Sequence, residues 1–539
     1  MTIALHITND NMLYTLKNAL TKTNDSTDSC FNRISQFRLR GYIKATQTEW
    51  TRSAWLTDLV KYGQDTNAPY SKRNCIGSRF DVEIVVGVLT ARDNFEERQS
   101  LRDSWFGFAQ SNERLMLKFI VGNEDCLTHP EYRRSPYGCT PSNLSYENID
   151  KEVMAVNISR TSQEEKDVAV PLPSRISFQV HHPIIIQKLG LYWRGASSSM
   201  TSTYQVYLFD DMNEETVVQV MFSSSSPGVS LGDYLFKPVE SFILPKDFQG
   251  SVVVKPLGED YGWLVTPGGS LTLETGGNVI SYMQYRWDEP QTSNLPIISE
   301  DVSDMFAGNF MFLIHGSEEL LEIVKQTDKK HQEWSTEMDR VQKRLQEENK
   351  KHRDIVLVDV VDTYQNLPLK VLLFHKWLTD NVDFKYLFKT DDDCFMNIHN
   401  ILKTINKTTF PESNVWWGNF RYNWAVQRHG KWAEHHYPST AYPAFACGSG
   451  NMLSADLVKW TAKNYRVLHQ YQGEDVSMAI WLSAILPNYL DDKMWICDEK
   501  CDQNMLASAE HSVDEIKQLW INWKECGNPC ECSAQSQIK

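Results

Sequence analysis

The most regular feature of the chain is a series of continuous apolar runs, each followed by a polar turn. Residues 82–90, 115–121 and 355–361 are mostly apolar without alternation, which is typical of strands buried on both faces of a sheet. Between the first two runs, residues 95–106 carry the apolar stripe of a helix. Strand, helix and strand in this order predict a parallel α/β sheet.

A further strand-like run, residues 386–388, leads into the three consecutive acids Asp391, Asp392 and Asp393. Ligands of α/β sheets bind at the carboxyl ends of the strands, so we expect these carboxylates at a binding edge. Adjacent like charges repel, and a divalent cation relieves that repulsion; oxygen ligands suit Mg²⁺ or Mn²⁺. The alternative is a solvated acidic turn, which Asp also favours, and the triplet alone does not decide between the two.

The pattern changes from about residue 126 to 300, where short β-branched or aromatic runs recur between Ser, Gly and Pro clusters. This pattern is typical of a β-sandwich. Because surface loops tolerate whole inserted domains, we expect a β-rich, sandwich-like insert within an α/β domain. The α/β pattern is expected to resume at residues 310–314, and residues 318–353 to form a solvated helix or helix pair.

These patterns divide the chain into four segments. Residues 1–79 are polar and irregular, and we interpret them as a stem or a mispredicted leader. Residues 80–125 and 301–539 are expected to form the two parts of the α/β domain, and residues 126–300 the insert.

A helix is predicted after the strand at residues 355–361, continuing through Trp377. Asp362 or Thr363 is its natural N-cap, because either side chain can accept a hydrogen bond from the first turn. We favour this capping role over a catalytic one.

Composition limits the classes of function. The formal net charge of −15, from 54 Lys and Arg against 69 Asp and Glu, argues against a nucleic-acid protein, which usually carries a basic face. An anionic substrate would need a cation or a local basic patch. With 41% hydrophobic residues among 539, the chain can form a sizeable core, and its length suggests about two to four domains.

The chain has eleven cysteines, and several are close in sequence: Cys126 with Cys139, Cys497 with Cys501, and Cys526 with Cys530 and Cys532. Disulfides formed in a lumenal or extracellular compartment are the simplest interpretation. Zinc bound by the C-terminal cysteines is the alternative, although no CxxC or His spacing supports it. The odd count predicts at least one free or intermolecular thiol.

The sequons and the N-terminus also bear on the compartment. Sequons at Asn24, Asn143, Asn157 and Asn406 fit a secretory route. The first residues contain neither a basic region nor a continuous apolar stretch, so neither a signal peptide nor a transmembrane helix is visible. Either the protein is cytosolic with reduced thiols, or the true first exon is missing from this sequence. We favour the second explanation, in which the missing part carries a membrane anchor.

Four motifs occur in order along the chain: Ala-Arg-Asp-Asn-Phe-Glu-Glu-Arg-Gln-Ser-Leu-Arg-Asp-Ser-Trp at 91–105, Asp-Thr-Tyr-x-Asn-Leu-x-Leu-Lys at 362–370, Lys-Thr-Asp-Asp-Asp at 389–393 and Gly-Glu-Asp-Val at 473–476. Together they resemble glycosyltransferase family 31, the β-1,3-glycosyltransferases. Each motif alone is weak evidence, whereas four in order are specific. The resemblance covers about residues 80–535.

The resemblance implies a GT-A-type nucleotide-diphospho-sugar transferase, with a Rossmann-like mixed sheet interrupted by the β-rich insert. Asp391 and Asp393 would hold Mn²⁺ or Mg²⁺, as the first interpretation of the acidic triplet requires. His511 stands where the family often has a further ligand, although a lone His is more often structural. His469 is a less favoured alternative.

The family's catalytic base is the acid of the Glu-Asp-Val motif, which corresponds to Asp475, and Glu474 would orient its surroundings or bind acceptor. An inverting transfer from an α-linked donor needs one such base on the acceptor hydroxyl. The alternative is that both acids only begin a helix, where acids are favoured. That alternative does not explain their recurrence with the other three motifs.

Donor binding is implied for Arg98, Arg102, Lys389 and Asp392. For the two arginines, the alternative is a pair of surface charges on a helix.

Sugar binding is implied for the Gly-Ser-Gly turn that contains Gly448 and Gly450, because glycines let a sugar approach the backbone. Trp416 and Trp417 would stack on sugar rings, although buried tryptophans commonly belong to the core.

Within the family, the resemblance implies UDP-GalNAc as donor and a terminal GlcNAc of a glycoprotein glycan, of the O-mannosyl type, as acceptor. It also implies a type II membrane protein of the Golgi or endoplasmic reticulum, and no nucleic-acid partner is expected. Galactosyl- and N-acetylglucosaminyltransferases share these motifs, so they remain alternatives. A non-catalytic glycan-binding protein is a second alternative, against which the intact Asp391, Asp393 and Asp475 argue.

Overall fold

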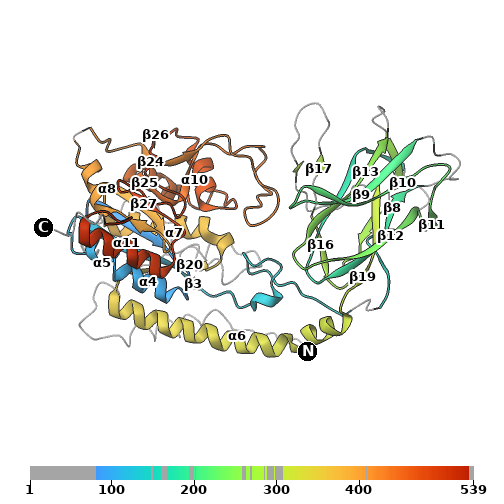
Figure 1. Cartoon of the computed structure of the whole chain (residues 1–539), viewed down its shortest axis with the longest axis horizontal. Coiled ribbons are helices and arrows are strands. Elements are labelled where there is room, and N and C mark those ends of the chain that lie inside the picture. Colours follow the sequence, from blue (N-terminus) through green and yellow to red (C-terminus); the bar gives the residue numbers. More distant parts are fainter. Residues whose placement is uncertain are drawn as a thin grey trace, which may run out of the picture. The chain divides into compact units, whose positions relative to one another are not determined.

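The computed structural model describes residues 80–146, 150–159, 167–193, 200, 202–257, 263–267, 270–283, 286–287, 296–297, 307–407 and 409–532. The predicted stem at residues 1–79 and the sequon at Asn24 lie outside these residues. The described chain contains an α/β part and a β-rich part (Figure 1).

The α/β part is built on a seven-stranded mixed sheet. In spatial order its strands are β20 (Ile355–Val361), β3 (Leu115–Glu124), β2 (Ile84–Leu89), β22 (Tyr386–Asp391), β25 (Phe445–Ser454), β24 (Val415–Arg421) and β26 (Asn488–Asp491). The first four strands are parallel, β25 is antiparallel to both neighbours, and β24 and β26 are parallel. The predicted α/β sheet is confirmed, and β22 is a buried strand that ends in the acidic triplet, as its apolar run indicates.

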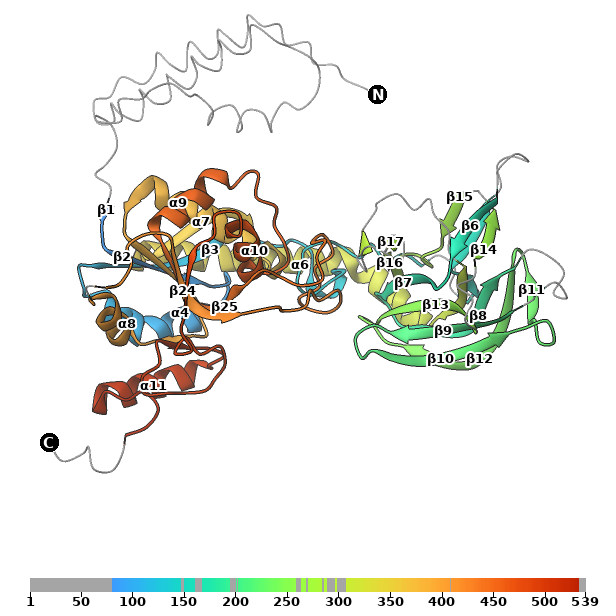
Figure 2. The same cartoon turned by 90° about the horizontal axis from the view of Figure 1, so that it is seen from above.

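Helices cover both faces of this sheet (Figure 2). The helices on one face are α4 (Phe95–Arg102), α5 (Trp105–Ala109), α8 (Ile398–Ile405) and α11 (Val513–Cys526), and those on the other are α7 (Leu367–Asn381), α9 (Ala455–Asn464) and α10 (Glu474–Leu482). Close packing of α7 requires Gly87, because a Cβ there would lie 2.5 Å from Phe374 Cε1.

The helix predicted over residues 95–106 is two helices. Ser104 has non-helical backbone angles, and its Oγ donates a 2.8 Å hydrogen bond to the carbonyl oxygen of Ser100. Serine side chains compete in this way for backbone groups, which explains the break between α4 and α5.

The main sheets of the β-rich part are two five-stranded sheets around one core. The first contains β10 (Glu215–Phe222), β9 (Thr203–Asp210), β13 (Gln249–Leu257), β7 (Ser174–Val180) and β16 (Ile280–Met283). The second contains β11 (Val229–Leu231), β12 (Tyr234–Leu244), β8 (Ile184–Tyr192), β19 (Gly308–Ile314) and β4 (Val153–Met154). Phe178 from the first sheet stacks on Phe310 from the second, with 4.6 Å between ring centres, so both sheets contribute to the same core.

The expectation that residues 310–314 resume the α/β pattern is wrong. This run lies in β19, which pairs antiparallel with β8 and β4 and so belongs to the β-rich part. A short apolar run looks the same whichever sheet buries it, and only the pairing partner decides the assignment.

A single helix, α6 (Ser317–His352), fills the charged segment that is predicted as a helix or helix pair, and it is 36 residues long. Leu320 near its start is buried in the core of the β-rich part, whereas Val341 and Leu345 near its end are buried in the core of the α/β part. Its apolar stripe is interrupted because the two ends pack against different cores.

Four disulfides join cysteines of the described chain: Cys126–Cys139, Cys447–Cys497, Cys501–Cys530 and Cys526–Cys532. The disulfide interpretation is confirmed, although Cys497 and Cys501 do not pair with each other. Because these sulfurs are bonded in pairs, the C-terminal cysteines have no thiolate left for zinc, and that alternative is wrong. Within the described residues Cys394 is a free, buried thiol.

Three of the four predicted sequons lie within the described residues. Asn143 and Asn406 are exposed and Asn157 is half-buried, while glycosylation at all three stays a prediction. Across the described parts of the chain, no helix combines the length and apolar character that crossing a bilayer requires.

Candidate active site

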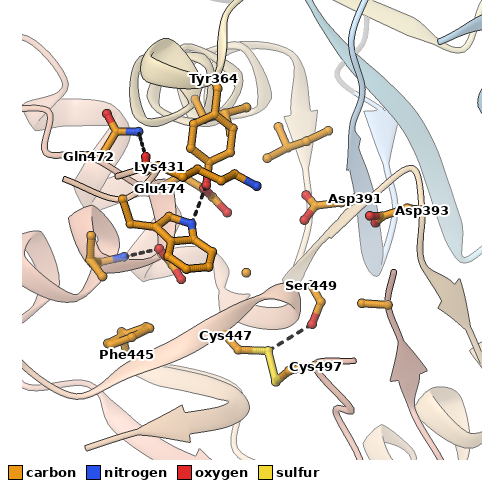
Figure 3. Close-up of a pocket in the computed structure, with 18 of the residues that line it drawn as sticks. Tyr364, Asp391, Asp393, Lys431, Phe445, Cys447, Ser449, Gln472, Glu474 and Cys497 are labelled. Carbon is orange, nitrogen blue, oxygen red and sulfur yellow. Dashed lines mark hydrogen bonds between the residues drawn. A yellow bond between two sulfur atoms is a disulfide. The ribbon is translucent and has the colours of Figure 1, made fainter. Parts of the chain in front are cut away.

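A cavity of about 680 Å³ opens where β2, β20 and β22 end and α10 begins (Figure 3). Its lining includes Gly448 of β25 and residues at the ends of these strands or at the start of α10: Leu89, Thr90, Asp362, Asp391, Asp392, Asp393, Glu474 and Asp475. The carboxyl ends of parallel strands are where sheets of this kind bind ligands. Residues far apart in the sequence therefore meet at the expected edge.

The acidic triplet divides its side chains between two environments. Asp391 and Asp393 lie together, with ligand atoms of both and of Cys394 all within 4.8 Å of one another. Asp392 accepts a 2.8 Å hydrogen bond from Asn94 Nδ2, and burial raises its pKa. Asp391 and Asp393 therefore form a close pair, whereas Asp392 is bonded to Asn94.

The pair fits a divalent cation that prefers oxygen ligands. The pKa of Asp391 is raised to about 7, because burial and the charges of Glu474 and Asp393 disfavour its ionised form, although Lys389 favours it. A cation would relieve this repulsion. Burial and the neighbouring acids raise the pKa of the Cys394 thiol, so it stays protonated and is a poor ligand. The remaining donors are carboxylate oxygens, which suit Mn²⁺ or Mg²⁺.

Lys389 connects the two acidic groups of the cavity. Its Nζ lies 2.6 Å from Glu474 Oε1 and 3.0 Å from Asp391 Oδ1, and it also donates to the carbonyl oxygen of Gly448. These partners use all three N–H groups of the ammonium. The prediction that Lys389 contacts a donor is therefore corrected, because its ammonium group pairs with Glu474 and Asp391.

Glu474 and Asp475 form the first turn of α10 and also line the cavity, so a helix start does not exclude a catalytic role, which stays a prediction. Burial raises the pKa of Glu474, but the Lys389 ammonium more than offsets it and leaves that pKa lowered. The pKa of Asp475 is raised to about 7 by burial and by the charge of Glu474. Neighbouring carboxyl groups with opposite shifts can take different roles: Glu474 stays ionised, while Asp475 can exchange a proton near neutral pH.

Gly448 makes room for this pair. A Cβ at Gly448 would lie 2.9 Å from Glu474 Oε1 and 3.9 Å from Asp475 Oδ2. Gly448 lines the cavity, and its contact with a sugar stays a prediction. Gly450 does not line the cavity, since a Cβ there would lie 2.9 Å from the buried Trp495 ring.

Asp362 is not the helix cap that its position suggests. Its Oδ1 accepts a 2.8 Å hydrogen bond from Lys370 Nζ, and its Oδ2 accepts a 2.9 Å bond from the backbone of Gly122. Lys370 also donates to the carbonyl oxygen of Thr90 at 2.7 Å. This buried pair joins β3 and the ends of β2 and β20 to α7, and both residues line the cavity.

His511 lies beside the triplet. Its backbone N–H donates a 3.0 Å hydrogen bond to the carbonyl oxygen of Asp393, and its Nε2 shares a 2.7 Å hydrogen bond with Ser508 Oγ. Burial lowers the pKa of the imidazole, which keeps it neutral. Metal ligation by His511 stays a prediction.

Arg98 and Arg102 do not reach the cavity. Arg98 is fully buried and bonds to Glu348 of α6 at 2.9 Å and to Thr90 Oγ1 at 3.1 Å. Arg102 bonds to Glu348 at 2.6 Å and to Asp354 at 2.8 Å. The donor-binding expectation is corrected, because these guanidinium groups are saturated by protein partners and hold α4 against α6.

Trp416 and Trp417 belong to the core. They are adjacent on β24, so their side chains point to opposite faces of the sheet, and both are buried. Trp416 Nε1 donates to Asn451 Oδ1 at 3.2 Å, and Trp417 Nε1 to Asp492 Oδ2 at 3.1 Å. The sugar-stacking expectation is wrong for these two residues.

The segment between β24 and β25 contributes a cavity wall that the sequence patterns do not predict. It includes Trp424, Lys431 and Trp432, and the Cys447–Cys497 disulfide lies next to it on the cavity surface. The segment has no periodicity, and the only sequence signal is its density of aromatic residues.

Replacing Arg98 by Ala should lower the free energy of unfolding by roughly 3–5 kcal/mol, as expected when one partner of a buried ion pair is removed. Chemical denaturation measures this change. Arg340→Ala on α6 is the control, because its ion pair with Glu337 is exposed and should contribute little. If folded Arg98→Lys protein loses its affinity for UDP while keeping its stability, the structural role is refuted.

Comparison with known proteins assigns the family. Residues 334–488 match the galactosyltransferase family. UDP-GalNAc:beta-1,3-N-acetylgalactosaminyltransferase 2 of Danio rerio is 38% identical over 456 residues, which cover 84% of this chain and 91% of the relative. The proteins of that name from Xenopus laevis and Homo sapiens are 37% and 36% identical, over 85% and 84% of this chain and 93% and 90% of theirs. The chain therefore belongs to glycosyltransferase family 31, the β-1,3-glycosyltransferases, and is a hexosyltransferase.

Proposed function

We propose that the protein is a metal-dependent, inverting glycosyltransferase that moves GalNAc from UDP-GalNAc, in β-1,3 linkage, to a terminal GlcNAc of an O-mannosyl glycan on a glycoprotein. The observation that carries the proposal is the convergence of Asp391 and Asp393 with Glu474 and Asp475 in one cavity. The names of the relatives support the donor and the linkage.

We further propose that the α/β part has the GT-A-type fold. The parallel strands β20, β3, β2 and β22, with the acids at their carboxyl ends, support this assignment. The four disulfides support a lumenal place of action, in the Golgi or endoplasmic reticulum, for a type II membrane protein.

In the proposed reaction, the acceptor hydroxyl attacks the anomeric carbon opposite the leaving diphosphate. The new C–O bond forms as the bond to the β-phosphate oxygen breaks, so an α-linked donor gives a β-linked product, and the electron pair leaves with UDP. Asp475 accepts the hydroxyl proton. Its pKa near 7 suits a base that is ionised before the step and protonated after it.

The other residues of the cavity prepare this step. Asp391 and Asp393 would hold the divalent cation, which when bound neutralises the charge that develops on the departing diphosphate. Lys389 keeps Glu474 ionised and in place, and the charge of Glu474 in turn raises the pKa of Asp475.

UDP release tests the function directly. The protein with Mn²⁺ and UDP-GalNAc should release UDP when a GlcNAc-terminated disaccharide is present, and much less without it. UDP-Gal and UDP-GlcNAc in parallel reactions identify the donor. If glycan binds and none of the donors is turned over, the non-catalytic alternative replaces the proposal.

Replacing Asp475 by Asn should lower kcat by orders of magnitude, because the hydroxyl proton then has no acceptor, and leave UDP affinity nearly unchanged. In the wild type at saturating Mn²⁺, which keeps Asp391 ionised, kcat/KM should fall as the pH drops below about 7, where Asp475 becomes protonated, and the variant should lack this acid limb. Steady-state kinetics and UDP titration give both quantities. Asp514→Asn is the control, because the Asp514 side chain is 95% exposed. A matching loss of UDP affinity would refute the base role.

Replacing Asp393 by Ala should abolish the metal dependence of donor binding, because a single remaining carboxylate holds a divalent cation poorly. UDP affinity is measured with and without Mn²⁺ for both proteins. The wild type should bind UDP more tightly with the ion, and the variant should show no such gain. A variant with an unchanged Mn²⁺ response contradicts the ligand assignment.

A further inference from the structure

The cavity has a second wall that is aromatic and basic. It comes from the segment between β24 and β25 and includes Trp424, Lys431, Trp432 and Tyr442. Trp424 and Trp432 are 47% and 53% exposed, and they are the exposed tryptophans among the side chains that the structure describes. Both line the same cavity. Exposed apolar rings in one concave place are typical of a binding surface.

The rings of this wall are held in place by protein contacts. Trp432 Nε1 donates a 3.0 Å hydrogen bond to the hydroxyl of Tyr364. Lys431 Nζ lies 4.7 Å from the centre of the Tyr364 ring, and the Arg421 guanidinium lies 5.7 Å from the Trp424 ring. An indole fixed through its N–H keeps an apolar face for a ligand and loses little freedom when the ligand binds.

A buried carboxylate ties the wall to the segment that carries the proposed base. Glu434 is 2% exposed, and it accepts hydrogen bonds from the backbone N–H groups of His436, of Tyr437 at 3.0 Å and of Gln472 at 2.6 Å. Gln472 is three residues before Asp475. The position of the aromatic wall is therefore set relative to Asp475.

The chemistry of this wall favours a neutral sugar over a diphosphate. A pyranose ring has an apolar face that can lie on an indole and hydroxyl groups that reach polar neighbours, here Lys431 and Gln427. The diphosphate and its cation belong at the acids that follow β22. The wall comes from the segment between β24 and β25 and lines the same cavity as Asp475, the proposed base.

We propose that Trp432, together with Trp424, binds the terminal sugar ring of the acceptor and places its hydroxyl at Asp475. This inference rests on the proposed function and adds the residues that recognise the acceptor. Trp416 and Trp417, in contrast, cannot do so, because both are buried in the core.

The test is the kinetics of Trp432→Ala and Trp432→Phe with a GlcNAc-terminated disaccharide as acceptor and UDP-GalNAc as donor. The acceptor KM should rise about tenfold or more in Trp432→Ala and less in Trp432→Phe, which keeps an aromatic face. The KM for UDP-GalNAc should stay unchanged. Phe108→Ala is the control, since Phe108 is 51% exposed and lies outside the cavity lining.

Two results overturn the inference: an unchanged acceptor KM, or an equal rise in the KM for UDP-GalNAc, which would assign the wall to the nucleotide. A wild-type protein that releases no UDP defeats the proposed function instead. In that case saturation-transfer NMR with the same disaccharide shows whether the wall binds a sugar. Loss of signal at its ring protons in Trp432→Ala supports the wall as a sugar site, and equal signals in both proteins refute it.

Discussion

One buried ammonium group allows four carboxylates to share a single cavity. Lys389 reaches Asp391 on its own strand and Glu474 at the start of a helix 85 residues further along the chain. Without this charge, the acids would repel one another and shift toward protonation. The surrounding structure serves this contact: β22 buries the lysine stem, and Gly448 accepts a hydrogen bond from the ammonium and leaves space for the carboxylates. The opposite pKa shifts of Glu474 and Asp475 follow from the same arrangement.

The parallel sheet and the acids at its edge could be predicted from the sequence because both depend on local pattern. Strands buried on two faces have no alternation, so β2, β3, β20 and β22 are recognisable as continuous apolar runs. The end of such a strand is also visible in the sequence, and it places Asp391 and Asp393 at the binding edge. Glu474 and Asp475 are recognisable only through the order of the motifs, because a pair of acids at a helix start has no specific meaning by itself.

The rest depends on partners that are distant in the sequence. Glu348, the ion-pair partner of Arg98, is 250 residues away, so nothing near Arg98 distinguishes a buried ion pair from a nucleotide ligand. The apolar run of β19 has no residue pattern that identifies the sheet in which it pairs. The surroundings of a tryptophan ring determine whether it belongs to the core or to the cavity. Trp416 lies in a regular strand and is buried, whereas Trp432 lies in an aperiodic segment and is exposed.

The Cys447–Cys497 disulfide gives the cavity a dependence on its chemical surroundings. It joins the start of β25 to the segment after β26, beside Gly448 and Ser449, and both of its cysteines line the cavity. Reduction would release this part of the wall from its covalent partner without changing a single charge of the acidic group. The covalent closure of this wall therefore depends on an oxidising compartment, whereas the charges of the acidic group do not.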